Sequence, residues 1–553
     1  MPSKLSVFTS ALSMMLLGAF PASIQAANIT FHDTVFKHYI VTYYDGKDGS
    51  SRDGEISETE AAKVDSIKIS SGYMDQKIKD LEDLSQFPNL VYVDCESNGI
   101  TKIDVSKNTK LLFLDFYNND VTELDVSAST ALTKLICAYN QLTALDVSKN
   151  TALTYLDCNK NQIAALDVSK NTVLTYLDCS KNQLTALDVS KNTALTKLYC
   201  GGNQLTVLDV SKNTLLTDLD CSYNQLKTLD VSKNTQLKSF GCAYNQLTAL
   251  DVSSNMNLQY LSCDSNRIAT LDVSNHTALT VLECSSNQIA ALDVSKSLEL
   301  THLDCSNNQL TVLDVSKNRY LESIECSGNR LTTLDLTNQI NLFWVYCRGN
   351  GLSQLDLPEE IHLTELDCGN NQLQNLDVSG FPVLTFLACD SNQLTELNIS
   401  QNTELEKIHC QANHLTTLDA SAIEDAWYWL LCGIQTTADD SVQILHLVLE
   451  TQQGERWQLL TSLYPDEDAY VEYNGKISAL PVPASASASF RVTLSGRHVM
   501  VLGLSEGPVR IYDLSGRVVA SSRLRNGSAT FALPHAGTYV VKSGSSTRRI
   551  AAQ

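Results

Sequence analysis

The sequence predicts a solenoid of short stacked strands, closed at its start by a helical cap and followed by a C-terminal β-sandwich domain. Two observations predict the solenoid: the chain repeats itself every 21 residues over most of its length, and cysteine recurs at that spacing from Cys137 to Cys410. A change of composition near residue 490 predicts the separate domain. The 553 residues allow about two to four domains in all.

The overall charge and the hydropathy pattern exclude two classes of protein. The 62 acidic and 40 basic residues give a net charge of -22 at pH 7. Because such a surface repels phosphate, we expect no nucleic-acid partner. No apolar run after residue 27 reaches the roughly 20 residues that span a bilayer, so we expect no transmembrane span.

The first residues have the pattern of a signal peptide, which we place at residues 1–26. One early cation, Lys4, precedes an apolar stretch that ends at Phe20, and small residues follow up to Ala26. A membrane anchor would need a longer stretch, and this one is interrupted by Thr9, Ser10 and Ser13. The pattern therefore predicts export.

Residues 84–434 consist of one repeated unit, which is visible in LTYLDCNKNQIAALDVSKN at 153–171. A period of 20 to 29 residues with this leucine spacing is that of a leucine-rich repeat. We expect about seventeen coils of a right-handed horseshoe. Asparagine stands three residues after the cysteine position in sixteen of sixteen coils, from Asn98 to Asn413. Because buried peptide groups must be paired, we expect these asparagines to point inward and bond the backbone.

The 16 cysteines are expected to form a ladder of buried free thiols rather than eight disulfides. Leu156 and Cys158 point to the same side of their strand, so each cysteine stacks on the next about 4.8 Å away. A disulfide prefers Cβ atoms ~3.8 Å apart and a torsion near ~90°, which parallel side chains in register do not present. Paired CxxC spacing for zinc is absent from the sequence.

The concave face of the solenoid is the predicted binding surface, because side chains of successive strands form one continuous surface there. The column before the cysteine is mostly acidic, which would attract a basic partner or bridging divalent cations. Large aromatic side chains are the candidate hot spots, although such tyrosines can instead pair across neighbouring strands. The binding candidates are Trp344, Tyr346, Arg348, Tyr155, Tyr176, Tyr199 and Tyr260, with the first three as the principal patch.

Residues 28–83 are predicted to form an N-terminal cap that contains an EF-hand-like segment. Asp53, Gly54, Ile56 and Glu60 match the second half of an EF-hand loop, but Asp45 lies eight residues before Asp53 instead of four. The alternative is a cap that only shields the first coil, with Ser57 capping a short helix, and both can be true. The candidate calcium ligands are Asp45, Asp48, Asp53 and Glu60.

The C-terminal region divides into a cap of the solenoid at 435–480, a Pro/Ala/Ser linker at 481–489 and a β-sandwich at 490–553. The last segment has nine basic and two acidic residues, in contrast to the acidic chain before it. Its strands alternate apolar and polar residues and are separated by glycine turns.

Two resemblances rest on these patterns. The cysteine in the strand, with the Leu-Asp-Val-Ser-Lys-Asn return segment, resembles the internalin J type of cysteine-ladder repeat and the BspA-like surface proteins. This resemblance implies adhesion, biofilm formation and contact with a host or partner bacterium, through a surface protein or glycan.

The run VRIYDLSGRV at 509–518, with GTYVV at 537–541 and a basic tail, resembles the type A C-terminal sorting domain of the type IX secretion system. That resemblance implies the type IX machinery as a partner. It also implies export across the outer membrane of a diderm bacterium and retention at its surface. The alternative is an ordinary ligand-binding β-sandwich.

Together these patterns predict a surface adhesin, not an enzyme, and no cofactor other than the calcium considered above. One alternative is a structural surface component without a dedicated receptor. Another is a hydrolase that uses paired carboxylates such as Asp157 and Asp178. The second is disfavoured because acidic residues repeat in most coils without a distinctive pocket.

Overall fold

The computed structural model describes residues 27–47, 49, 52–69, 77–359, 361–420 and 422–423, and the backbone of the strands between 429 and 552. The expected signal peptide and the linker at 481–489 lie outside the described residues. The chain divides into two compact units, Met1–Ile163 and Ala164–Gln553.

The first unit begins with a small helical cap. Helix α1 (Thr34–Tyr44) starts at Asp33, whose side chain accepts hydrogen bonds from the backbone N–H of Val35 and Phe36. A capping box formed by Ser57 and Glu60 starts α2 (Glu58–Ala61), which confirms the predicted cap at Ser57. A 3-10 helix, η1 (Glu82–Gln86), completes the described helices. Phe36 packs edge-on against Phe87, so the cap has an aromatic core of its own.

The strands of the first unit stack in parallel and in register. The stacking order is β1 (Ser66–Lys68), β3 (Tyr92–Asp94), β5 (Phe113–Asp115), β6 (Lys134–Ile136) and β7 (Tyr155–Asp157). From β3 on, paired residues are one repeat apart, as Phe113 and Lys134 are. A second, two-stranded parallel sheet joins β2 (Asp80–Leu81) to β4 (Lys102–Ile103).

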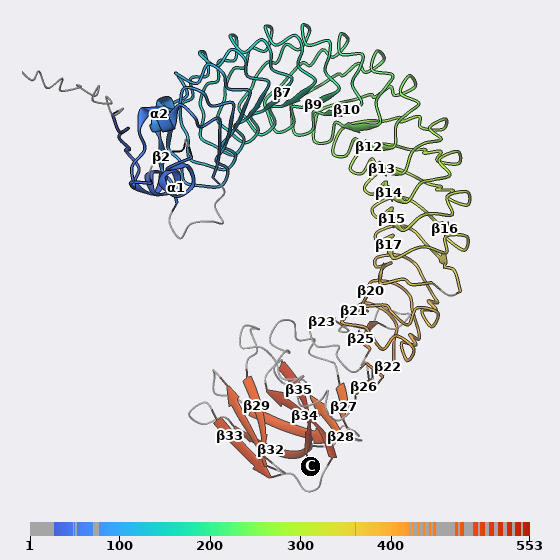
Figure 1. Cartoon of the computed structure of the whole chain (residues 1–553). Coiled ribbons are helices and arrows are strands. Elements are labelled where there is room, and N and C mark those ends of the chain that lie inside the picture. The colour runs from blue at the N-terminus through green and yellow to red at the C-terminus, as the bar shows by residue number, and fades with distance from the viewer. Residues whose placement is uncertain are drawn as a thin grey trace, which may run out of the picture. The chain divides into compact units, whose positions relative to one another are not determined.

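The second unit continues the same pattern, and its strands line the inner side of its curve (Figure 1). They are β8 (Tyr176–Asp178), β9 (Lys197–Tyr199), β10 (Asp218–Asp220), β11 (Ser239–Gly241), β12 (Tyr260–Ser262), β13 (Val281–Glu283), β14 (His302–Asp304), β15 (Ser323–Glu325), β17 (Trp344–Tyr346), β19 (Glu365–Asp367), β20 (Phe386–Ala388), β21 (Lys407–His409) and β23 (Trp429–Leu431). A separate parallel pair joins β16 (Thr333–Asp335) to β18 (Gln354–Asp356). Four strands from β3 and thirteen from β8 match the expected number of coils.

Beyond β21 the described secondary-structure elements are strands. Strand β22 (Thr417–Asp419) pairs with β26 (His446–Leu449), which pairs with β27 (Tyr470–Tyr473) and through it with β28 (Lys476–Ala479). A short hairpin joins β24 (Gln435–Thr436) to β25 (Val442–Gln443).

The last residues form two antiparallel sheets, as expected for a small β-sandwich. One sheet contains β29 (Phe490–Ser495), β30 (His498–Gly503) and β33 (Ser528–Ala532). The other contains β31 (Pro508–Asp513), β32 (Val518–Arg523), β34 (Gly537–Ser543) and β35 (Ser546–Ala552).

The cysteines follow the predicted alternation. In most described strands the middle residue is buried and its neighbours are partly exposed, as in β8. The fifteen described cysteines, Cys95 to Cys410, are free and buried, and Cys432 lies outside the described residues. Several thiols point to the next coil: Cys95 Sγ donates to the Asp115 carbonyl at 3.3 Å, and Cys221 Sγ donates to the Gly241 carbonyl at 3.5 Å. The ladder of buried thiols is thus confirmed for these residues.

The asparagines after the cysteines tie each coil to the one before it. Asn224 Oδ1 accepts from the Leu205 N–H at 2.9 Å, and its Nδ2 lies 3.1 Å from the Cys200 carbonyl. The same Nδ2 lies 3.0 Å from the carbonyl of Cys221 in its own coil. This arrangement repeats along the solenoid and confirms the predicted inward orientation. One asparagine side chain therefore pairs backbone groups of two coils. These groups have no partner in the strand ladder.

A second ladder of buried side chains, which we did not predict, lies on the return segment. Asn213 is fully buried, and its Nδ2 donates to the carbonyls of Val189 at 3.0 Å and Asn192 at 2.9 Å. Ser297 and Gln339 replace asparagine at this position in other coils and still bond a preceding coil. The final Asn of Leu-Asp-Val-Ser-Lys-Asn is thus a structural residue.

We predict that Asn224→Ala lowers the free energy of unfolding by about 2–4 kcal/mol, because buried groups such as the Leu205 N–H and the Cys200 carbonyl lose a partner at about 1–3 kcal/mol each. Urea unfolding measures the change. The exposed Lys212→Ala in the same region serves as the control and should stay within about 0.5 kcal/mol of the wild type. Equal stability of both variants would contradict the role of the ladder.

We predict that the buried thiols make the protein less stable at alkaline pH. Burial raises the pKa of the Cys221 thiol well above its ordinary value, whereas the unfolded thiol titrates near pH ~8.5. Stability from this thiol is complete below that pH and falls as the pH rises further, by up to about 1.4 kcal/mol per unit.

Cys221→Ala isolates this effect in urea unfolding series under reducing conditions. The variant should be less stable at neutral pH, because it leaves a cavity, but its stability should fall less steeply above about pH 8.5. Parallel pH profiles for the variant and the wild type would show that the thiol is not buried in its protonated form.

Candidate functional site

The strand face, which we define as the first and third residues of each three-residue strand of the long parallel sheet from β3 to β21, presents side chains outward in both units. Because the strands are parallel and in register, equivalent side chains of neighbouring coils stand side by side. This geometry produces columns of like residues within each unit.

Aromatic and cationic side chains alternate at the start of the strand face. The rings of Tyr92 and Phe113 stack with centroids 4.4 Å apart. Lys134 Nζ lies 5.3 Å from the Phe113 centroid and 4.4 Å from that of the predicted site residue Tyr155. Tyr155 thus contacts a neighbour on its own face, as the alternative interpretation of these tyrosines expected.

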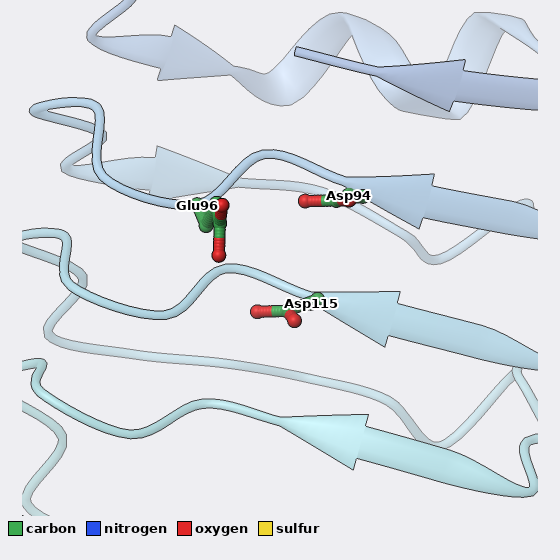
Figure 2. Close-up of side chains that lie close together, drawn as sticks. All are labelled: Asp94, Glu96 and Asp115. Carbon is green, nitrogen blue, oxygen red and sulfur yellow. The ribbon is translucent and has the colours of Figure 1, made fainter. Parts of the chain in front are cut away.

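Three carboxylates gather where β3 and β5 end. One carboxylate oxygen each of Asp94, Glu96 and Asp115 lies within 4.8 Å of the others, and Figure 2 shows the three side chains close together where two neighbouring strands end. Burial raises the pKa of Asp115 to about 6, and the negative charges of Asp94 and Glu96 add to the shift. Lys68 Nζ lies 3.2 Å from Asp94 Oδ2 and offsets part of this charge.

The other predicted tyrosines of the second unit also have partners. Tyr176 and Tyr199 approach to 5.7 Å between ring centroids, and the Tyr199 hydroxyl lies 3.5 Å from Asp218 Oδ1. The Tyr260 hydroxyl donates to Glu283 Oε2 at 2.7 Å. These residues are therefore half-buried parts of the sheet surface rather than isolated anchors.

An acidic stretch crosses the middle of the second unit. Asp264, Glu283, Asp304 and Glu325 belong to four successive coils. Burial raises the pKa of Glu325, and the charges of the other three raise it further. A stretch of this kind favours a basic partner.

The predicted patch lies on β17 and the residues around it. The side chain of Trp344 is at the most exposed position of its strand, with 40% of the residue accessible, and its ring centroid lies 6.5 Å from that of the equally exposed Phe343. The Tyr346 hydroxyl donates to Glu365 on β19. The exposed apolar area of Trp344 thus lies on the same strand as the Tyr346 hydroxyl, which is already hydrogen-bonded.

Arg348, the third residue of the patch, is held by two carboxylates. Its Nη1 and Nη2 donate to the two oxygens of Asp390 at 2.7 and 2.6 Å, and Nη1 lies 3.3 Å from Asp367 Oδ1. Asp390 is 42 residues further along the chain, which is two coils away. The hydrogen bond to Asp390 raises the pKa of Arg348, so the guanidinium stays charged.

Gly369 makes this contact across two coils possible. It occupies, in the coil between them, the position that Arg348 and Asp390 occupy in theirs. A Cβ atom on Gly369 would collide with Arg348 Nη1 and lie 2.7 Å from Asp390 Oδ1. Gly369, Asp390 and Phe343 were not among the predicted site residues, although Arg, Gly and Asp follow one another at intervals of 21 residues.

A further pair of aromatic residues was missed on the edge of the strand face. Tyr223 and Tyr244 are exposed, and their rings stack 4.2 Å apart. Both lie two residues after a cysteine, where the backbone has positive φ in the described coils. Their 21-residue spacing is visible in the sequence, but the two tyrosines lie outside the two concave columns from which the candidates were predicted.

The predicted calcium ligands lie in the cap of the first unit. Asp45 directly follows α1, Glu60 lies within α2, and Asp53 is in the loop between them, where its Oδ1 accepts from the Glu55 N–H at 3.0 Å. Asp48 lies outside the described residues. Asp157 and Asp178, named for a hydrolase, are the third residues of β7 and β8.

The parallel 21-residue coils define a leucine-rich repeat protein. The functional domain of internalin J from Listeria monocytogenes, which includes a cysteine ladder, is similar in structure, with a TM-score of 0.55 and 27% identity, covering 90% of this chain and 92% of that one. A leucine-rich repeat protein of Leptospira interrogans matches with a TM-score of 0.52 and 23% identity, over 65% and 92%. A plant peptide hormone receptor in complex with RGF2 matches with a TM-score of 0.55 and 15% identity, over 76% and 81%.

No protein-family model matches the chain, and neither does any curated protein sequence. In the part of the chain that the structure describes, no helix combines the length and the apolar character that membrane crossing requires.

We predict that Gly369→Ala destabilises the protein by about 1–3 kcal/mol, because the new methyl group separates Arg348 from the nearly buried Asp390. The figure is lowered for solvent screening, since the Arg348 side chain is 41% exposed. Gly351→Ala, where a Cβ meets only ordinary contacts, is the control.

A double-mutant cycle in urea tests the cause. Most of the penalty of Gly369→Ala should disappear when Arg348→Ala is already present. Additive penalties would mean that Gly369 acts through its backbone and not by making room for Arg348.

Proposed function

We propose that this chain is a cell-surface adhesin that binds a protein partner through the strand face of its second unit, centred on Trp344. The single observation that carries the proposal is the exposed Trp344–Phe343 pair on a strand held between β15 and β19. Tryptophan is enriched among the residues that dominate binding energies at interfaces.

The surroundings of Trp344 support an interface that is ordered before its partner arrives. Tyr346 is hydrogen-bonded to Glu365, and Arg348 is clamped between Asp367 and Asp390. Because these side chains already have fixed partners, binding would order few of them anew. Such pre-organisation lowers the entropic cost of association.

Charge specifies the kind of partner. The acidic stretch from Asp264 to Glu325 lies in the coils just before the patch. A protein with a basic surface beside an apolar side chain would match both features. Its charge would mainly accelerate association, and the contact with Trp344 would slow dissociation.

The comparisons support protein binding as the activity of this fold. The internalin J domain shares the cysteine ladder with this chain, and the plant receptor was determined with its ligand RGF2. The same resemblance motivates the finer proposal, that the adhesin promotes biofilm formation or attachment to host or partner cells.

The route to the cell surface belongs to the same proposal. The segment 509–518 overlaps β31 and the first residue of β32, and its companion at 537–541 lies within β34 of the C-terminal sheets. We infer that these strands form the sorting domain that the type IX secretion machinery recognises and that retention at the outer surface follows.

We predict that Trp344→Ala weakens partner binding at least about 10-fold, as expected when an interface hot spot of about 2 kcal/mol is truncated. The partner is first selected by presenting the immobilised chain to host-cell surface proteins, partner bacteria and glycan arrays. Affinity is then measured by surface plasmon resonance. Tyr320→Ala removes an aromatic residue that is 54% exposed but lies outside the strands, and it should leave affinity unchanged.

Three results would overturn the proposal. Equal affinity of Trp344→Ala and the wild type would show that the patch around Trp344 does not bind the partner. Binding to glycans alone would show that the partner is a glycan and not a protein. Binding to nothing would favour a structural surface component.

A further inference from the structure

The N-terminal cap contains a helix–loop–helix whose loop is closed at both ends. Helix α1 ends at Tyr44, Asp45 follows at its C-cap, and Ser57 begins α2 (Figure 1). The backbone N–H of Gly54 donates to Asp45 Oδ2 at 2.9 Å, and the N–H of Gly46 donates to Glu60 Oε1 at 3.1 Å. The first bond joins the Asp45 carboxylate to the later half of the loop, and the second holds the Glu60 carboxylate against the backbone of Gly46, the residue after Asp45.

This closure resolves the mismatch in the sequence. Asp45 precedes Asp53 by four residues more than an EF-hand loop allows, yet its carboxylate still receives the N–H of the glycine in the matching half. Gly49 and Gly54 adopt positive φ of 92° and 84°, which lets the longer loop turn sharply.

Asp45 carries a buried oxygen that lacks a partner. The residue is 5% exposed, and its Oδ1 accepts no hydrogen bond within the protein. Among the described residues, no lysine, arginine or histidine forms an ion pair with Asp45. An ionised carboxylate in such a place is costly unless a cation compensates it.

Glu60 is a second buried carboxylate, at the other end of the loop. The residue is 6% exposed, and its Oε2 accepts from the Ser57 N–H at 2.8 Å, which fixes the side chain toward the loop. Two buried carboxylates at the ends of one loop concentrate negative charge. Carboxylate and backbone carbonyl oxygens are the ligands that Ca²⁺ takes, in numbers of six to eight.

We propose that the loop between α1 and α2 binds one Ca²⁺ ion, with the carboxylates of Asp45 and Glu60 as ligands. The unpartnered Oδ1 of Asp45 is the group that the ion satisfies. Asp53 is exposed and bonds the Glu55 N–H, so it shapes the loop. Binding joins the ends of the two helices and thereby stabilises the cap against the first coil.

The carboxylates at β3 and β5 provide an internal control. Asp94, Glu96 and Asp115 also cluster, but Asp94 Oδ2 already meets Lys68 Nζ at 3.2 Å. Asp94→Asn therefore lowers negative charge elsewhere in the same unit without touching the loop.

The test is calorimetric titration of the full chain with CaCl₂ after treatment with a chelator, with MgCl₂ in parallel. The wild type should bind one Ca²⁺ in the loop, and its melting temperature should rise with calcium concentration. Asp45→Asn and Glu60→Gln should each weaken binding at least about 10-fold, whereas Asp94→Asn should not. Asp45→Asn keeps an oxygen for the Gly54 N–H, and circular dichroism confirms that each variant is folded.

Several outcomes would overturn the assignment. One is the absence of calcium binding by the wild type at millimolar concentration. A second is unchanged binding in folded Asp45→Asn. A third is loss of binding only in Asp94→Asn, which would assign the ion to the strand-face cluster instead.

Discussion

The hydrogen bonds of the buried asparagines are the constraint on which the solenoid depends. Each three-residue strand pairs only a few peptide groups, and the chain must then leave the sheet and turn back to begin the next coil. Asn224 and its equivalents supply the missing partners at that point, in their own coil and in the coil before. The side chain is long enough to do so only if coils keep the same register. A fixed register in turn places the cysteine, or Phe116 in its stead, and the two outward strand residues at equivalent positions in successive described coils.

The register of the coils determines which side chains are neighbours on the strand face. Because equivalent positions stand side by side, a charge or ring in one coil meets its counterpart in the next. The result ranges from stacked rings at Tyr92 and Phe113 to the shared negative charge around Glu325. Arg348 departs from nearest-neighbour pairing, since it bridges two coils over a glycine. The sites that distinguish this chain are therefore local breaks in a regular pattern.

The repeat, the thiol ladder and the inward asparagines could be predicted because each follows from periodicity and from the need to pair buried backbone. The second ladder, at Asn213, was not predicted because a polar residue in a return segment is typical of an exposed turn. Arg348 was predicted as a binding residue, but its two carboxylate partners depend on side-chain reach rather than on spacing within one coil. The loop at Asp45 was ambiguous, since the spacing of Asp45 and Asp53 in the sequence does not show that the Asp45 carboxylate accepts the Gly54 N–H or that Glu60 accepts the Gly46 N–H.

Native-state hydrogen exchange of the amides that donate to asparagine oxygens tests the central claim most directly. The N–H groups of Leu142, Leu205 and Leu226 lie outside the strands, yet each donates to a buried Oδ1 at 2.9–3.0 Å. They should exchange as slowly as the strand amides of the same coils and open only when the coil unfolds. Exchange at the rate of exposed turns would mean that the asparagine ladder does not hold the coils together.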